Sequence, residues 1–291
     1  MKLPPLAYHR AESVEHAIAL LGQYQGEAKI IAGGQSLIPM LAYRLAAPVA
    51  LIDIGRLTEL ATIRLDDQGL SIGSLTRWCD IQSSIEIRRH YPLLHDAIGH
   101  VAHYQIRNRG TIGGSLAHCD PAAECPAVVL ACQGEIIVQG SKGTRSVRAE
   151  DFFQGLLSTD LGPDEVITSI RLPPWNPARL WAFSEFSRRA GDFALAGVAM
   201  HFEMVSDCIS TPSIVGFGVG DRALVLRATQ DTLESNPPET ETIARAVSIA
   251  REEIDPPLDP HAPPDYRRAL FGVLLERALK EALGRNRRLM S

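Results

Sequence analysis

The chain has 291 residues, of which 45% are hydrophobic and 22% charged, and its formal net charge is −5 with a pI of about 6.0. This length and composition are typical of a globular protein of two domains, and the acidic balance argues against nucleic acid as a partner. Because no run of about 18 apolar residues occurs and the N-terminal segment lacks the apolar core of a signal peptide, we expect no membrane span and a cytoplasmic protein.

The first 57 residues carry alternating helix and strand patterns. Apolar residues at helical spacing follow Ser13 over residues 13–24, and Ser13 is a suitable N-cap. A short apolar run at 28–31 predicts a strand, residues 37–45 predict a helix, and 49–54 predict a second strand. A glycine pair lies between the first strand and the second helix.

From about residue 59 the pattern changes. Residues 61–76 predict a hairpin with a turn near Asp66–Gly69, and residues 77–90 and 92–103 predict helices. A further helix is expected to start near Pro121, because proline suits a first helical turn. A hairpin over 135–153 and a strand over 165–173 complete this part.

The proline-rich segment 173–179 is the predicted linker. After it, residues 181–189, 193–204 and 211–220 predict three strands, and residues 239–253 and 265–283 predict two helices. The sequence GFGVGD at 216–221 does not open a helix, so we interpret it as a turn at the end of a strand and not as a dinucleotide-binding motif.

The glycine pair Gly33–Gly34 lies in the sequence AGGQS, between a predicted strand and a predicted helix. Backbone N–H groups in such a turn bind phosphate, and Ser36 adds a hydroxyl. No lysine follows as in the P-loop motif, which argues against a nucleotide triphosphatase. A tight turn with no ligand remains an alternative explanation of this pair.

A second glycine pair, Gly113–Gly114, lies between Thr111 and Ser115. Asp120 and Glu124 follow near the start of the next helix, where a carboxylate either caps the helix or accepts bonds from ligand hydroxyl or ring N–H groups. His118, inside the same segment, is a further candidate for a ligand contact. Two such turns in one chain favour a large anionic dinucleotide held between two walls.

The five cysteines are odd in number, and no two of them have C-x-x-C spacing. This argues against a disulfide framework and against an iron–sulfur or structural zinc site within the chain. No nucleophile elbow or zinc-protease motif occurs either. We therefore predict no metal ligand and no catalytic residue.

Five segments together resemble a known family: residues 29–54, 107–132, 151–173, 183–200 and 265–279. The chain resembles the FAD-binding medium subunit of the molybdenum hydroxylases, such as carbon monoxide, nicotine and bacterial xanthine dehydrogenases. The resemblance implies an α+β fold. A vanillyl-alcohol-oxidase-type (PCMH-type) FAD-binding domain would span residues 1–175, in subdomains of about 1–57 and 58–175. A C-terminal flavoprotein domain with a three-stranded antiparallel sheet and helices would span 176–291.

The resemblance also implies FAD as the cofactor and a set of residues that bind it. Glu124 would take the place of an aspartate that contacts the cofactor, and Ile167 would pack near the flavin ring. The family often has a lysine where this chain has Ser184 and Glu185, and an asparagine where it has Ser115. The pyrophosphate would be held by Ile31, Ala32, Gly33, Gly34, Gln35, Ser36 and Leu37, opposite Thr111, Gly113, Gly114 and Ser115.

In the family, a large subunit hydroxylates the substrate at a molybdenum cofactor. Electrons then pass through two [2Fe–2S] clusters on a small subunit to the FAD. The resemblance implies that this chain performs the flavin step for an external acceptor, in a dimer of heterotrimers. A stand-alone FAD oxidase and a flavin-binding assembly module remain the alternatives.

Overall fold

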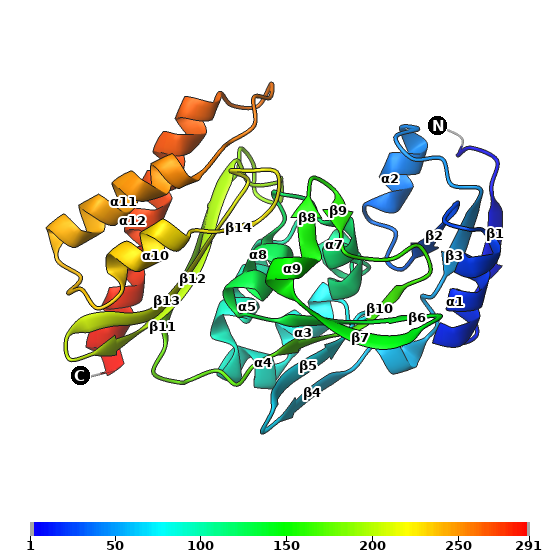
Figure 1. Cartoon of the computed structure of the whole chain (residues 1–291), viewed down its shortest axis with the longest axis horizontal. Helices are drawn as coiled ribbons and strands as arrows, with labels where there is room; N and C mark the ends of the chain where they lie inside the picture. Colours follow the sequence, from blue (N-terminus) through cyan, green and yellow to red (C-terminus); the bar gives the residue numbers. More distant parts are fainter. Residues whose placement is uncertain (1–2, 290–291) are drawn as a thin grey trace.

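In the computed structural model, which describes residues 3–289, three main sheets follow one another along an elongated molecule (Figure 1). The N-terminal strands lie at one end, and helices α10–α12 lie at the other. None of the helices within 3–289 combines the length and the apolar character needed to cross a membrane.

The first sheet is parallel, in the order β1–β3–β2 (β1 Ala7–Arg10, β3 Ala50–Asp53, β2 Ala28–Ile31). Helix α1 (Val14–Gln23) begins after Ser13, whose Oγ accepts a bond from the His16 N–H at 3.1 Å. Helix α2 (Leu37–Ala42) joins β2 to β3. These elements confirm the prediction. Strand β1 was missed because its residues are mostly exposed and show no apolar alternation.

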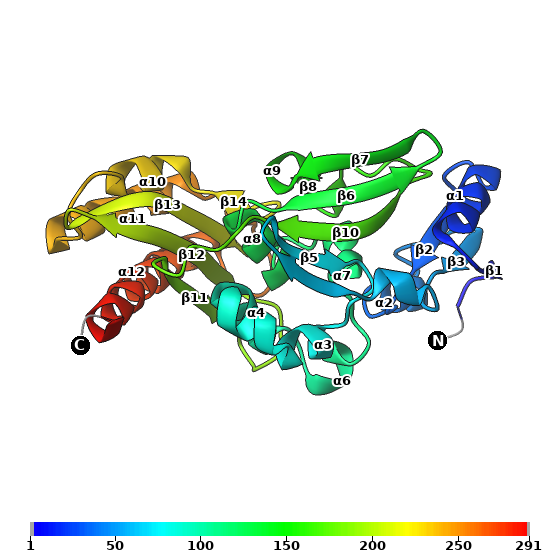
Figure 2. The same ribbon diagram turned by 90° about the horizontal axis from the view of Figure 1, so that it is seen from below.

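The second sheet has five antiparallel strands in the order β4–β5–β10–β6–β7 (β4 Ile63–Asp66, β5 Gly69–Gly73, β10 Val166–Leu172, β6 Glu135–Gly140, β7 Gly143–Arg148). Both predicted hairpins are confirmed. Figure 2 shows helices α3 (Trp78–Ser83), α4 (Ile85–His90) and α6 (Tyr104–Arg107) together on one side of this sheet. The remaining elements of this region are η1 (Thr58–Leu60), α5 (Pro92–His100), α7 (Ile112–His118), α8 (Glu124–Ala131), α9 (Ala149–Phe152), β8 (Phe153–Gly155) and β9 (Ser158–Thr159).

Three predictions in this region were wrong in detail. The helix expected over 77–90 is broken at Ser84, whose Oγ accepts a bond from the Ile87 N–H at 3.2 Å and so caps α4. The helix expected from Pro121 begins at Glu124, because Asp120 accepts a bond from the Ala122 N–H at 2.8 Å and holds a turn there. The segment 92–103 is helical only to residue 100.

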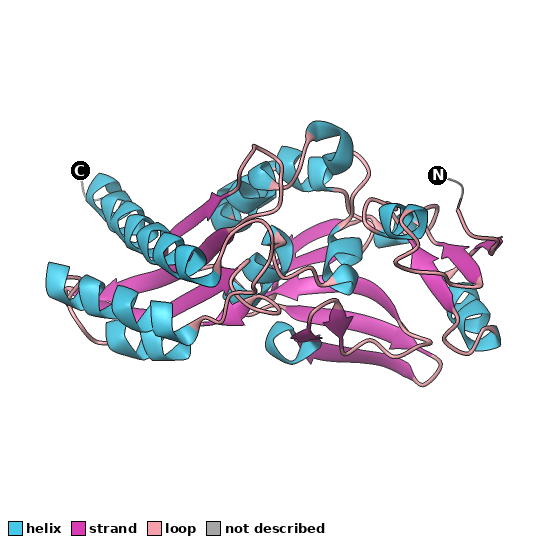
Figure 3. Ribbon diagram, turned by 90° about the horizontal axis from the view of Figure 1, so that it is seen from above, coloured by secondary structure: helices cyan, strands magenta, loops and turns pink. Residues whose placement is uncertain are grey.

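The third sheet is antiparallel, in the order β11–β12–β13–β14 (β11 Leu180–Phe186, β12 Ala196–Val205, β13 Cys208–Phe217, β14 Leu224–Val225). The three long strands agree with the prediction, and β14 adds a two-residue edge. Helices α10 (Arg227–Leu233), α11 (Thr240–Glu253) and α12 (Pro264–Leu289) gather at this end of the molecule (Figure 3). Helix α10 was missed, because its seven residues are mostly polar.

Residues 173–179 connect β10 to β11 without helix or strand. The division of the chain into domains at residue 175 stays a prediction. Helix α8 packs against β12 and β13, so the third sheet has helices on both of its faces. One core cluster joins α5 and α8 to Phe183, Val215 and Phe217 of the third sheet.

Candidate functional site

A cavity of about 780 Å³ lies between the first and the second sheet, a volume typical of cofactor sites. Its walls come from the loop after β2, from α7, from the loop over 157–163 and from the start of α8. All of the candidate residues line this one cavity: Ile31, Ala32, Gly33, Gly34, Gln35, Ser36, Leu37, Thr111, Gly113, Gly114, Ser115, Glu124 and Ile167. Their contacts with FAD remain a prediction.

The first glycine segment is a tight turn, as expected. Gly34 has a φ of +71°, which a residue with a side chain rarely adopts, and the Gln35 side-chain amide donates to the Gly33 carbonyl at 3.0 Å. Ser36 precedes α2 but makes no side-chain cap bond. Its hydroxyl is therefore not used by the helix.

The second glycine pair lies inside the first turn of α7, which corrects the expectation of a loop. Thr111 caps this helix, with its Oγ1 accepting a bond from the Gly114 N–H at 3.2 Å. The Gly113 N–H donates to the Ser74 carbonyl at 2.9 Å, and a Cβ at Gly113 would lie 2.5 Å from the Ser74 Cβ. Glycine is needed here because the helix packs directly on the chain after β5.

The two glycine segments touch each other. A Cβ at Gly33 would lie 2.1 Å from the carbonyl oxygen of Arg109, just before the second segment. Backbone therefore meets backbone at this point, and the two segments form adjoining walls of the cavity. This is the arrangement that a dinucleotide held from two sides requires.

Glu124 is the first residue of α8 and is only 6% exposed. Burial, and then the nearby charge of Glu185, raise the pKa of Glu124 to about 8. The Glu124 side chain is therefore mostly protonated at neutral pH. Ile167 contributes a buried apolar side chain from β10.

Ser184 and Glu185 lie on β11, and neither of them lines the cavity. Glu185 faces His100 of α5, and its Oε1 is 3.4 Å from the His100 Nδ1. The charges of Glu185 and His100 have opposite effects on the pKa of Glu124, which Glu185 raises and His100 lowers. Neither residue of the pair was predicted to act as part of the site.

Several residues on the cavity wall were not predicted. Ser74, after β5, is buried, and its Oγ has no hydrogen-bond partner within the described chain. Asp192 and Phe193 reach the cavity from the loop between β11 and β12. The sequence had indicated His118 and Asp120 as candidates, and both also line this cavity. Burial lowers the pKa of the His118 imidazole.

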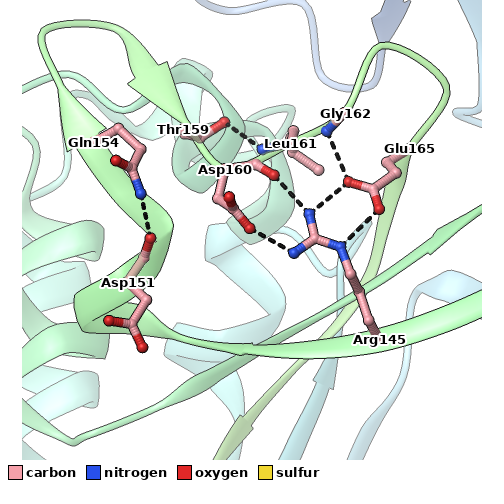
Figure 4. A network of polar contacts seen from close by, with 8 residues as sticks. All are labelled: Arg145, Asp151, Gln154, Thr159, Asp160, Leu161, Gly162 and Glu165. Carbon is pink, nitrogen blue, oxygen red and sulfur yellow. Dashed lines mark hydrogen bonds and ion pairs between the residues drawn. The ribbon is translucent and has the colours of Figure 1, made fainter.

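An ion-pair network holds the wall formed by the loop over 157–165 (Figure 4). The Arg145 guanidinium of β7 donates to both carboxylate oxygens of Glu165 at 2.7 Å and also to the Asp160 side chain. The Gly162 N–H donates to Glu165 at 2.7 Å. A bidentate ion pair of this kind fixes the orientation of the loop as well as holding the loop against β7.

A second cavity, of about 920 Å³, lies across the first glycine turn. It includes none of the α7 residues Gly113, Gly114 and Ser115, and it lacks Glu124 and Ile167. We therefore take the first cavity as the candidate site. The candidate residues that border both cavities are Ile31, Ala32, Gly33, Gly34, Gln35 and Thr111.

The residues of the first cavity fit a dinucleotide. Both glycine segments line the cavity, and their backbone can approach a ligand closely because glycine has no side chain. The unpartnered Ser74 hydroxyl supplies a further polar contact on the same wall. Apolar side chains such as Ile167 and Leu161 supply surface for a flat ring.

Comparison with known proteins agrees with this assignment over nearly the whole chain. Residues 4–175 match the model of the FAD-binding domain in molybdopterin dehydrogenase, and residues 181–282 match that of the carbon monoxide dehydrogenase flavoprotein C-terminal domain. The 6-hydroxypseudooxynicotine dehydrogenase complex subunit alpha of Paenarthrobacter nicotinovorans is 39% identical over 99% of this chain and 97% of its own length.

Two solved structures have the same fold. Carbon monoxide dehydrogenase from Hydrogenophaga pseudoflava superimposes with a TM-score of 0.96 at 37% identity, over 98% of this chain and 99% of the other. Quinoline 2-oxidoreductase from Pseudomonas putida 86 has a TM-score of 0.92 at 35% identity, over 98% and 99%. The chain therefore belongs to the family of FAD-binding medium subunits of the molybdenum hydroxylases.

Proposed function

We propose that this chain carries electrons through FAD in a molybdenum-containing hydroxylase or dehydrogenase. It would take them from [2Fe–2S] clusters of a small partner subunit, while substrate is hydroxylated on a large subunit that holds the molybdenum cofactor. The observation that carries the proposal is the meeting of both glycine segments at one cavity within a family of FAD-binding subunits. An external acceptor would then receive the electrons.

Bound FAD would supply the redox chemistry, because its ring exchanges electrons singly or in pairs. The chain would bind and orient it. Backbone N–H groups of residues 31–37 would hold the pyrophosphate from one side, and Thr111, Gly113, Gly114 and Ser115 would hold it from the other. Glu124 and Ile167 would lie beside the ring, with the loop over 157–165 as a further wall.

We propose the assembly to be a dimer of heterotrimers in the cytoplasm. All five cysteines are free thiols, which is typical of a reducing compartment. The cysteines have no spacing for an iron–sulfur cluster, so the clusters would belong to the partner. The stand-alone oxidase and the assembly module are outcomes that the experiments below distinguish from this proposal.

The first test is FAD binding by the purified full-length chain, measured by absorption and by identifying the released cofactor. We expect one FAD per chain. Gly114→Asp should lower the affinity about a hundredfold or more, because a carboxylate beside the pyrophosphate repels it. Gly22→Asp adds the same charge on an exposed helix position with nothing within 4 Å, and should bind FAD as the wild type does. A folded chain that takes up no FAD would contradict the proposal.

The second test is co-expression with a small [2Fe–2S] subunit and a large molybdenum-cofactor subunit. We expect a complex that contains iron and molybdenum besides FAD, in which substrate reduces the flavin. The chain alone should show no turnover with the same substrate. Turnover by the isolated chain would instead identify a stand-alone oxidase. A stable complex in which substrate never reduces the flavin would identify an assembly module.

A further inference from the structure

The second cavity, of about 920 Å³, is lined by three arginines whose charge the fold does not neutralise. Arg56, Arg77 and Arg109 are all exposed, and none of them forms an ion pair with any residue within 3–289. A guanidinium stays protonated at physiological pH, so each arginine keeps its full charge. The cavity therefore presents three cationic hydrogen-bond donors.

Two aspartates line the same cavity, and the fold already uses both of their carboxylates. Asp53 accepts a bond from the Tyr8 hydroxyl and pairs with Arg10 at 3.8 Å. Asp80 accepts a bond from the Arg77 N–H at 3.3 Å. The cavity thus has an excess of positive charge in a chain whose formal net charge is −5. A local excess of this kind attracts anions.

Backbone contacts bring the three arginines to one place. A backbone bridge between Arg77 and Thr111 joins the start of α3 to the segment that contains Arg109. The Arg109 carbonyl oxygen in turn lies against the glycine turn, 2.1 Å from where a Cβ at Gly33 would be. Arg56 follows β3, which pairs with the strand that leads into this turn. None of these contacts uses a guanidinium, so all three remain free to bind a ligand.

The remaining wall of the cavity supplies apolar surface. Leu57 and Leu75 are buried there, whereas Tyr8 is 53% and Ile38 36% exposed. The volume is in the range of sites for small organic molecules and exceeds what a single phosphate ion needs. Aromatic side chains stack on nucleobases, and arginines bind phosphate through two parallel bonds. A flat base with phosphate groups fits both kinds of wall.

We propose that the second cavity binds a mononucleotide, with its phosphates on Arg56, Arg77 and Arg109 and its base against Tyr8 and Ile38. None of these five residues lines the first cavity, so the site is separate from the FAD site. The two cavities meet only along the wall that they share at the glycine turn. The inference goes beyond the proposed function and does not depend on it.

The test is calorimetric titration of the FAD-loaded full-length chain with ADP. FAD fills the first cavity, so that ADP reports on the second. We expect one ADP to bind per chain. Adenosine, which lacks the phosphates, should bind about tenfold more weakly or less well still. Added NaCl should weaken the binding of ADP, because salt screens the exposed guanidinium charges.

Arg56→Gln, Arg77→Gln and Arg109→Gln should each weaken ADP binding about tenfold, with the FAD content of the chain unchanged. Arg64→Gln is the matched control. It removes the same charge from an exposed position of β4, and Arg64 does not line the cavity. Its ADP affinity should stay within about twofold of the wild type.

Three results would overturn the inference. The first is ADP binding that appears only after FAD has been removed, which would assign ADP to the first cavity. The second is equal ADP affinity in Arg109→Gln and Arg64→Gln. The third is unchanged ADP binding in arginine variants that no longer bind a co-expressed small [2Fe–2S] subunit, because the arginines would then belong to a protein interface.

Failure of the proposed function is distinguishable from these results. A wild-type chain that takes up no FAD would contradict the proposed function alone. The same ADP titration of the FAD-free chain would still test the second cavity. Arg109→Gln should then weaken ADP binding, whereas Gly114→Asp, which alters the first cavity and not the second, should leave it unchanged.

Discussion

Gly33 has no space for a side chain, because it lies against the start of the other glycine segment. A Cβ there would be 2.1 Å from the Arg109 carbonyl oxygen and 3.0 Å from the Gly110 Cα. Gly33→Ala should therefore push the two walls of the cavity apart and destabilise the protein by about 1–3 kcal/mol, measured by urea unfolding. FAD affinity should fall in parallel. Gly99→Ala, at an exposed position of α5 where a Cβ meets nothing within 4 Å, is the control. A Gly33→Ala protein as stable as the wild type would refute this account.

His201 is a buried imidazole whose titration should make stability depend on pH. Its Nε2 donates to the Ala131 carbonyl at 3.1 Å, and burial lowers the pKa of His201 to about 4. The unfolded chain binds a proton near pH 6.5, so it holds more protons than the folded chain between these values. Stability should therefore be fully present above pH 6.5 and decrease toward pH 4, by up to about 3 kcal/mol.

Chemical denaturation at a series of pH values tests this. His201→Gln should reduce the loss of stability between pH 6.5 and 4. His261→Gln, at an exposed position, should leave this loss unchanged. The Ser213 hydroxyl also donates to the Ala131 carbonyl, at 2.8 Å, so this oxygen keeps one donor in the variant. Equal slopes in His201→Gln and the wild type would show that another group causes the acid sensitivity.

Among the elements, the loop over 157–165 depends on β7 for its position. The Arg145 guanidinium satisfies Glu165 and Asp160 together, and the Asp160 backbone carbonyl accepts a further bond at 2.6 Å. Arg145→Met should free the loop and lower FAD affinity about tenfold, with little change in the unfolding midpoint. Arg145→Lys should restore FAD affinity only in part, because an ammonium group cannot form the bidentate pair with Glu165.

Arg148→Met is the matched control for this prediction. Arg148 lies on the same strand and pairs with Asp151 at 2.7 Å, but this pair is exposed and far less constrained. Surface pairs of this kind contribute little. FAD titration by fluorescence quenching should therefore separate the two variants. Equal affinities in both would mean that the loop holds its place without Arg145.

Across the whole molecule, the second and third sheets share one core. Helix α8 packs on β12 and β13, and Phe183 stacks on Phe217 within the cluster that also contains residues of the second sheet. We therefore expect a single cooperative unfolding transition for the full chain. A chain ended after residue 175 should lose this transition and bind a hydrophobic dye, because one side of α8 becomes exposed. A truncated chain that melts at the wild-type temperature would contradict this.

Much of the local structure follows from residues that are neighbours in the chain. Ser13 caps α1 as its side chain predicts, and Asp66–Gly69 closes the hairpin between β4 and β5. Helical or alternating spacing of apolar residues indicated most of the long elements, since such patterns need no distant contact. The order of motifs along the chain was also enough to indicate the family and its cofactor.

Other features depend on contacts between residues far apart in the chain. The segment at Gly113–Gly114 forms a helix because Ser74 and Thr111 hold it, although a glycine pair by itself favours a turn. The protonation of Glu124 depends on burial and on Glu185, which lies on a strand of another sheet. The charge of a buried group is set by its surroundings in space, and these exist only after folding. The sequence therefore indicated the elements, the family and the cofactor, whereas the shared wall at Gly33 and the burial of Glu124 arise only from tertiary packing.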